Sequence, residues 1–357
     1  MSALASLPPD PRVRTSIRTI AVVVAVTLFM MAMSLWWGTG SVRLGPVTAW
    51  NALFDSENAE RLEVVAAEAR VVRILMSVLV GAALASAGAL LQTLYRNPLA
   101  SPEITGVTQG SVVAVVVWLV YGPRESADPD WLFPVIGCIG GIAAGLLTYA
   151  VSRLGGRVDP LRLILVGVLL GGLLGSLLGL ALIASDGLGL DLISWTVGTV
   201  QSATWGRVGL LAAALAVCLP LVVIAIPYGN ALALGEDVAQ GTGLTVNRAR
   251  GVVLFAAAAV TAAAVSLVGG IGFVGLVAPH LVRRRTGSDL RRLLPTAAVV
   301  GALLVLVADF ASRNIRPRDL ATPFGAAEMV GAFALPTGVY LALIGAPFFI
   351  HLLRRQP

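Results

Sequence analysis

The sequence predicts an all-α polytopic membrane protein, a single transmembrane domain of residues 1–357 with about ten helices that cross the bilayer. Of the 357 residues, 57% are hydrophobic and only 12% are charged, and the mean hydropathy is +0.89. A soluble domain carries roughly 25% charged residues. A spanning helix needs ~20 mostly apolar residues, and about ten such stretches are present. They do not alternate apolar and polar residues, which excludes a transmembrane barrel.

Short polar or Gly/Pro-rich breaks separate the predicted spans. Arg12 and Arg14 precede the first span and Arg18 lies at its start, as in a signal peptide, but the span is too long for the core of a signal peptide and many spans follow it. We therefore expect a retained helix after a cytoplasmic tail of residues 1–16. The ten spans are predicted at 17–37, 72–94, 109–121, 131–152, 161–184, 207–227, 250–268, 271–284, 293–312 and 335–353.

The third and eighth of these stretches are short for a full crossing. Short or Gly-interrupted segments are typical of helices that do not run straight through the bilayer, because their ends line a protected cavity. We expect this behaviour of 109–121 and 271–284.

Glycines recur every four residues on two spans, which leaves one face of each helix without side chains. Such a face either packs closely on a neighbouring helix or leaves open space for a translocation path. Both alternatives stay open for both spans. The residues are Gly137, Gly141 and Gly145 on the fourth span, and Gly167, Gly171, Gly175 and Gly179 on the fifth.

The distribution of arginine predicts the orientation. All 25 basic residues are arginine, and with the N-terminus inside, 16 of them fall in cytoplasmic segments and nine in external ones. The positive-inside rule therefore places both termini in the cytoplasm. The exceptions lie at helix mouths, with Arg70 and Arg73 before the second span and Arg313 after the ninth.

The sequence predicts no catalytic residues, no bound cofactor, no metal site and no nucleic-acid partner. A P-loop needs a lysine to reach the phosphates, and the chain contains none. If transport is driven by ATP, another polypeptide binds the ATP and Mg²⁺. Two lone cysteines and two distant histidines supply no spaced set of metal ligands.

Asp309 is the only acidic residue within a predicted span. Carboxylates inside a membrane are costly and are candidates for function. Arg313 lies one helical turn further on, and an ion pair between residues four apart is favoured over a role in proton relay.

A short cytoplasmic helix is predicted near 235–240, within the connecting region 229–250. Glu236 and Asp237 at its start are favoured by the helix dipole, and Gly241 and Gly243 are natural stops.

Several motifs resemble those of the FecCD-type (BtuC-like) permeases. Residues 70–111 combine an Arg-x-x-Arg entry, a Gly-Ala-x-x-Gln turn and an Arg-Asn-Pro-Leu-Ala loop, as that family does. Further blocks are similar to the family in the same order, namely LGEDVAQGTGLTVNRAR at 234–250, IGFVGLVAPHLVRRRTGSD at 271–289, LVADFASR at 306–313 and LPTGVYLALIGAPFF at 335–349.

The resemblance implies a type II ABC importer permease of ten helices in a bacterial cytoplasmic membrane. Its partners would be membrane lipid, a second permease subunit, two copies of an ABC ATPase and an extracytoplasmic substrate-binding protein. The family serves ferric siderophores, haem and vitamin B12. Ser101–Glu103 and the segment 157–167 look more like second subunits of ferric-siderophore systems, which favours a heterodimer and that cargo.

The resemblance also implies roles for particular residues. Arg70, Arg73 and Arg313 would receive acidic residues of the binding protein, although lipid headgroups are an alternative partner. The short cytoplasmic helix would seat in a cleft of the ATPase through Gly235, Glu236, Asp237, Ala239, Gly241 and Leu244. One departure from the family is a long external loop at 313–334.

Two other functional classes are alternatives to an ATP-driven importer. A secondary transporter would also show many spans and broken helices, but buried ionisable residues that could bind a coupling ion are scarce here. A membrane scaffold explains fewer of the motifs. Haem or vitamin B12 remains an alternative cargo within the same family.

Overall fold

The computed structural model describes residues 11–37, 44–55, 60–122, 131–154, 156, 158–184, 195–315 and 335–354. Across these residues the regular elements are all helices, as predicted. They are α1 (Pro11–Trp36), α2 (Pro46–Phe54), α3 (Arg61–Leu94), the 3₁₀ helix η3 (Pro102–Thr105), α4 (Val107–Tyr121), α5 (Leu132–Ser152), α6 (Pro160–Ala184), α8 (Trp205–Leu234), α9 (Glu236–Gly241), α10 (Val246–Val268), α11 (Val274–Thr286), α12 (Leu290–Asn314) and α14 (Thr337–Arg354).

Each of the ten predicted spans corresponds to one of these helices. Seven helices of the described chain are long and apolar enough to cross a membrane, namely α1, α3, α5, α6, α8, α10 and α12. The third and eighth spans are the short helices α4, of 15 residues, and α11, of 13 residues. Glycines with left-handed backbone precede them, Gly106 directly before α4 and Gly269 at the end of α10. Both spans are therefore short helices, as their lengths indicate, and that their ends line a protected cavity stays a prediction.

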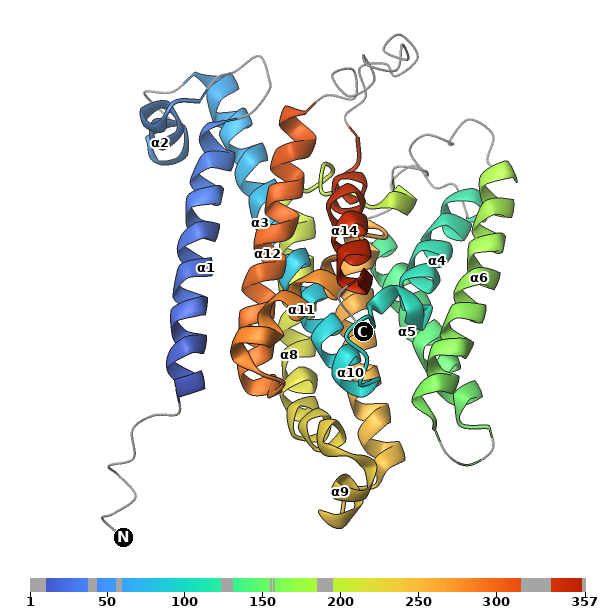
Figure 1. The fold of residues 1–357 in the computed structure, drawn as a ribbon. Coiled ribbons are helices and arrows are strands. Elements are labelled where there is room, and N and C mark those ends of the chain that lie inside the picture. The colour runs from blue at the N-terminus through green and yellow to red at the C-terminus, as the bar shows by residue number, and fades with distance from the viewer. Residues whose placement is uncertain are drawn as a thin grey trace.

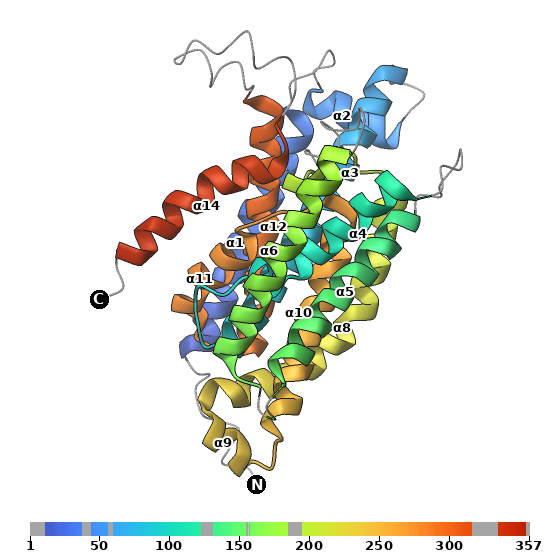
Figure 2. The ribbon, with the colours of Figure 1, turned by 90° about the vertical axis from the view of Figure 1, so that its right-hand side faces the viewer.

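The long helices form one bundle, with α2 at one end and α9 at the other (Figure 1). We refer to these as the α2 end and the α9 end. The helices α3 and α10 are buried along most of their apolar length, whereas α1, α6 and α8 are largely exposed. After a turn of the view, α14 projects obliquely from the bundle (Figure 2). The exposed helices therefore surround a core of α3 and α10.

Glycines bring the central helices into backbone contact. A Cβ atom added to Gly81 of α3 would overlap the carbonyl oxygen of Gly301 on α12, and the reverse substitution would do the same. Gly88 of α3 lies equally close to Gly275 of α11. Small residues permit such close approach of helices in membranes, so these crossings fix the spacing of α3, α11 and α12.

The two predicted glycine faces have different environments. On α5, Gly137, Gly141 and Gly145 lie against side chains of α4 and α10, so this face is a packing surface.

The glycine face of α6 is divided along the helix. Gly167 packs on the backbone at Ile104, and a Cβ atom added to Gly171 would lie 3.6 Å from the side chain of Gln109. A Cβ atom on Gly175 or Gly179 would meet nothing within 4 Å. The face of α6 that carries Gly175 and Gly179 therefore opens onto empty space in the isolated chain.

Some boundaries differ from the prediction. α1 begins at Pro11, inside the stretch expected to be the tail 1–16, and α3 begins about three turns before the predicted span at 72. The region 229–250 consists of the end of α8, α9 and the start of α10. Of the predicted long loop 313–334, residues 316–334 lie outside the described residues. Helix α2 was not predicted.

Candidate functional site

The short helix α9 has its start and stop fixed by two glycines. Gly235 precedes it with a φ of +127°, a backbone conformation that side chains rarely adopt. At its end, Gly243 has a φ of +82°, its N–H donates to the carbonyl of Gln240, and the N–H of Leu244 donates to that of Ala239. These two bonds are the Schellman arrangement that ends a helix on a left-handed glycine.

The residue that stops α9 is therefore Gly243 and not Gly241. Gly241 is the last residue of the helix, and it has open space around the position of a side chain. The sequence offered both glycines, and only the hydrogen bonds distinguish them. Gly241 stays a predicted contact residue because it is exposed at the tip.

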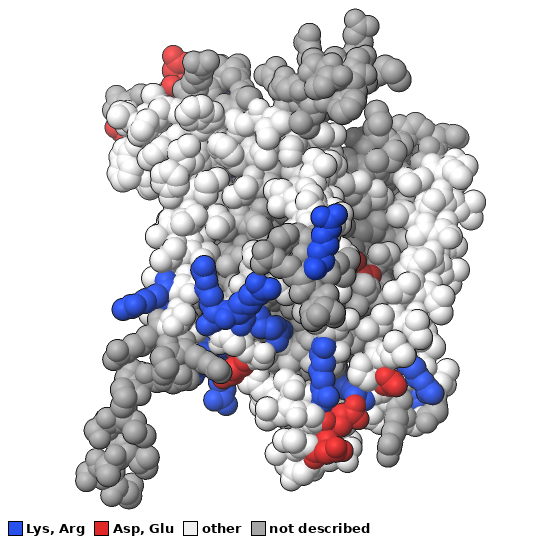
Figure 3. Space-filling view, in the orientation of Figure 1, with Lys and Arg blue, Asp and Glu red and all other residues white. Residues whose placement is uncertain are grey.

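Helix α9 buries one side and exposes the other. Ala239 is buried against the bundle, whereas Glu236, Asp237 and Val238 are exposed, as is Leu234 just before the helix. Exposed apolar side chains beside carboxylates on a protruding helix form a surface suited to a protein partner. Figure 3 shows acidic side chains gathered over the α9 end, with arginines above them.

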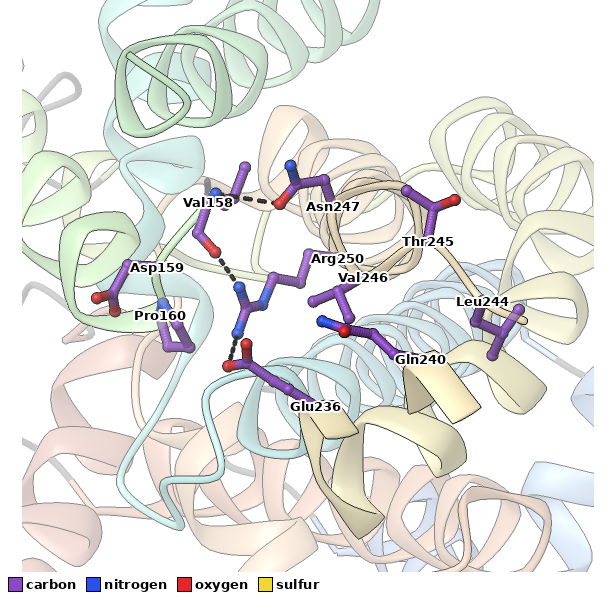
Figure 4. Close-up of a pocket in the computed structure, with 10 residues that line it drawn as sticks. All are labelled: Val158, Asp159, Pro160, Glu236, Gln240, Leu244, Thr245, Val246, Asn247 and Arg250. Atoms are coloured by element: carbon purple, nitrogen blue, oxygen red, sulfur yellow. Dashed lines mark hydrogen bonds and ion pairs between the residues drawn. The ribbon is translucent and has the colours of Figure 1, made fainter. Parts of the chain in front are cut away.

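Arg250 of α10 lies at the base of α9 and is buried, with 6% of its side chain exposed. Its guanidinium donates to the carboxylate of Glu236 on α9 and to the backbone carbonyl of Val158, which precedes α6 (Figure 4). Asn247, one turn earlier, accepts from the N–H of Val158 at 3.1 Å and donates to the carbonyl of Gly156 at 3.0 Å. The first turn of α10 thus holds the connection between α5 and α6.

A cavity of about 480 Å³ opens beside Arg250. Its walls come from the segment before and at the start of α6, from α9, and from the first turn of α10. The lining residues are Val158, Asp159, Pro160, Glu236, Gln240, Leu244, Thr245, Val246, Asn247 and Arg250.

A second arginine supports α9 from the loop of the Arg-Asn-Pro-Leu-Ala motif. The Nε of Arg96 donates at 2.9 Å to the carbonyl of Leu232, in the last turn of α8. Its backbone is left-handed, with a φ of 49°, which is uncommon for a residue with a side chain. The motif therefore holds the helix end from which α9 departs.

The three arginines predicted at helix mouths lie together at the α2 end. Arg73 of α3 donates to Asp309 of α12 at 2.6 Å, and Arg313 pairs with the other carboxylate oxygen at 3.1 Å. Arg70 donates to the carbonyl of Leu35, in the last turn of α1, at 2.7 Å. We call Arg70, Arg73, Asp309 and Arg313 the arginine cluster.

The cluster joins three helices. Besides its pair with Asp309, Arg313 donates to the backbone and hydroxyl oxygens of Ser34 on α1. The exposed fraction is 0% for the Asp309 side chain, 9% for Arg313 and 19% for Arg73. The predicted ion pair between Asp309 and Arg313 is confirmed. Arg73 is a further partner of Asp309, from a helix 236 positions away in sequence.

Sequence reasoning missed three of these residues. Arg250 and Asn247 could be suspected because polar side chains that begin an apolar span need partners. The partner that they share, Val158, lies 92 and 89 positions away, whereas the second partner of Arg250, Glu236, is only 14 positions away. Arg96 is part of a recognised motif, yet nothing local indicates that it reaches Leu232.

A family model described as the FecCD transport family matches residues 24–355. The Fe(3+)-citrate import system permease protein YfmE of Bacillus subtilis is 31% identical over 335 residues, which are 94% of this chain and 95% of that protein. The vitamin B12 import system permease protein BtuC of Vibrio cholerae is 36% identical and covers 93% of this chain and 92% of its own length.

A solved structure is similar over almost the whole fold. It is described as an inward-facing conformation of a metal-chelate type ABC transporter, and it superposes with a TM-score of 0.75 at 26% identity. The similarity covers 95% of this chain and 99% of that one. The predicted architecture is confirmed by this match.

Proposed function

This chain belongs to the FecCD transport family, and we propose that it imports iron held by a siderophore. As a member it is a permease subunit of an ABC importer, which works with an ATPase and a substrate-binding protein. The observation that carries the proposed cargo is the similarity to YfmE over nearly the full length of both chains. Vitamin B12 is the second candidate, because BtuC of Vibrio cholerae is similar over a comparable length.

We infer that the α9 end faces the cytoplasm and that α9 is the contact with the ATPase. Two features support this assignment. The arginines on the face in Figure 3 gather toward that end, as the positive-inside rule expects of a cytoplasmic side. The exposed Val238 and Asp237 offer a mixed apolar and acidic surface on a helix whose ends are fixed by Gly235 and Gly243. The chain itself would then hydrolyse no ATP.

The open glycine face of α6 is the proposed site of the path or of the second subunit. Gly175 and Gly179 leave room beside exposed leucines such as Leu173 and Leu180. A helix with small residues on one face can approach a partner helix closely. We propose that the partner is a different permease chain, as the motifs around Glu103 favour.

The cargo is tested with the complete transporter in proteoliposomes. We expect ATP-dependent accumulation of radioactive iron supplied with the binding protein and one of three chelators, namely citrate, a hydroxamate and a catecholate. Cobalamin is supplied in a parallel assay. A complex whose ATPase lacks its catalytic glutamate is the control. Uptake of cobalamin alone would replace the proposed cargo, and uptake driven by an ion gradient without ATP would replace the proposed mechanism.

The arginine cluster is proposed to receive acidic residues of the binding protein. Arg73 is its most exposed ion-paired member, so we expect Arg73→Gln to weaken the affinity of the binding protein for the complex. The loss should be larger at low salt than at high salt, because salt screens the attraction between the charges of the two proteins. The measurement is a titration at two ionic strengths. Arg207→Gln is the matched control, since this partly buried arginine lies at the same end, in the first turn of α8, and hydrogen-bonds only to Ser202 among the contacts of its side chain that are described. Equal affinities for wild type and Arg73→Gln would assign the cluster to the membrane or to packing alone.

A further inference from the structure

Three elements of the α9 end meet at one buried side chain. Arg250 belongs to the first turns of α10, Glu236 opens α9, and Val158 lies two residues before the start of α6. The guanidinium donates to a carboxylate on one side and to a backbone carbonyl on the other (Figure 4). The charged head therefore bridges α9 and the start of α6.

The ion pair between Arg250 and Glu236 borders a cavity that no side chain fills. The cavity beside Arg250 is lined by Val158, Asp159 and Pro160 on the α6 side and by Glu236 and Gln240 on the α9 side. On the side toward α6, Glu236 and Gln240 of α9 therefore face a cavity and not a packed side chain. Within the described chain, Glu236 makes the only side-chain hydrogen bond or ion pair that joins α9 to another helix. Arg250 is thus the polar contact through which a displacement of α9 acts on the start of α6.

Further hydrogen bonds hold the α6 side of the bridge. Asn247 holds both Gly156 and Val158 to α10, and the carboxylate of Asp159 caps the start of α6 by accepting from the N–H of Leu161 at 2.7 Å. The connection before α6 is therefore joined to the first turn of α10 by these hydrogen bonds. A buried guanidinium keeps its partners, because a charge left without them in a poorly solvated site is strongly disfavoured.

We propose that Arg250 is a positioning residue that makes α9, the first turn of α10 and the start of α6 move together. This inference rests on the proposed function, in which the ATPase moves α9. The moving unit carries α6, whose open face at Gly175 and Gly179 is the proposed path or subunit contact. Arg250 thereby transmits ATP-driven displacement to the helix that faces the cargo or the partner subunit.

The first measurement is the amount of cargo imported per ATP hydrolysed. The complete complex is used in proteoliposomes with its binding protein and the ferric chelate that the wild type transports. We expect Glu236→Gln and Arg250→Gln each to lower this ratio by about tenfold, within the range of ordinary coupling energies, and the double variant to be no worse. Arg250→Lys should restore part of the ratio, since an ammonium group can still pair with Glu236. Arg248→Gln is the control, because Arg248 is exposed on the same helix.

The second measurement does not need cargo. A spin label at Leu169, which is exposed on α6, should report a nucleotide-dependent change in the wild-type complex that is lost in Glu236→Gln. Glu236 is half-exposed, so this variant tests the bridge even if Arg250→Gln fails to assemble. A wild-type ratio and an unaltered spin-label response in Glu236→Gln would overturn the inference. Failure of the wild-type complex to import any tested cargo would instead overturn the proposed function.

Discussion

Gly81→Leu is expected to abolish accumulation of folded protein. The position of a Cβ atom at Gly81 coincides with the backbone of Gly301, so no rotamer change on α12 can make room. Adding side-chain volume to a packed core usually costs about 1–3 kcal/mol when neighbouring side chains can adjust. Here two backbones must separate, and α3 and α12 form the most extensive helix pair of the described chain. The cost should therefore exceed that range.

The measurement is the fraction of monodisperse protein after detergent extraction, together with its apparent melting temperature. Gly175→Leu is the matched control, because the same substitution on α6 enters open space. We expect this control to fold like the wild type, and to lose uptake in proteoliposomes if α6 lines the path. Normal yield of Gly81→Leu would show that α3 and α12 are not in backbone contact.

The spans were predictable because hydropathy is a local property. Each of the ten apolar stretches became a helix, and the short stretches at 109–121 and 271–284 became the short helices α4 and α11. The start of α3 at Arg61 was missed, because Glu63, Glu68 and Arg70 end the apolar run while the helix continues. Hydropathy detects the bilayer-embedded part of a helix, and a capping box at Glu60 sets its actual start.

The composition of the candidate sites was only partly predictable. Spacing of four residues placed Asp309 beside Arg313, since both lie on one helix face. Arg73 reaches Asp309, and Arg250 reaches Val158, through the packing of segments 236 and 92 positions apart, which no local pattern encodes. Gly243, and not Gly241, ends α9. The two hydrogen bonds that close the helix, from the N–H groups of Gly243 and Leu244, go with a positive φ at Gly243, and the sequence alone does not show which glycine makes them.

Asp309→Asn is the second substitution with a large expected effect. The carboxylate of Asp309 is fully buried and is the shared partner of Arg73 and Arg313. Removing one partner of a buried ion pair typically costs about 3–5 kcal/mol, because the remaining charges stay buried without compensation. Arg313 also holds Ser34, so the end of α1 should loosen with the cluster.

The loss should appear as a lower apparent melting temperature in detergent, with Glu68→Gln unchanged, since Glu68 is an exposed carboxylate on the same α3. A triple variant separates packing from recognition. Replacing a buried ion pair or triad by apolar residues of similar volume is often neutral or stabilising, so Asp309→Leu with Arg73→Met and Arg313→Met should recover much of the stability lost in Asp309→Asn. The recovered protein should still bind its binding protein weakly, because the charges proposed for docking are gone. Recovery of both stability and affinity would mean that Arg73 and Arg313 serve only to hold α1, α3 and α12 together.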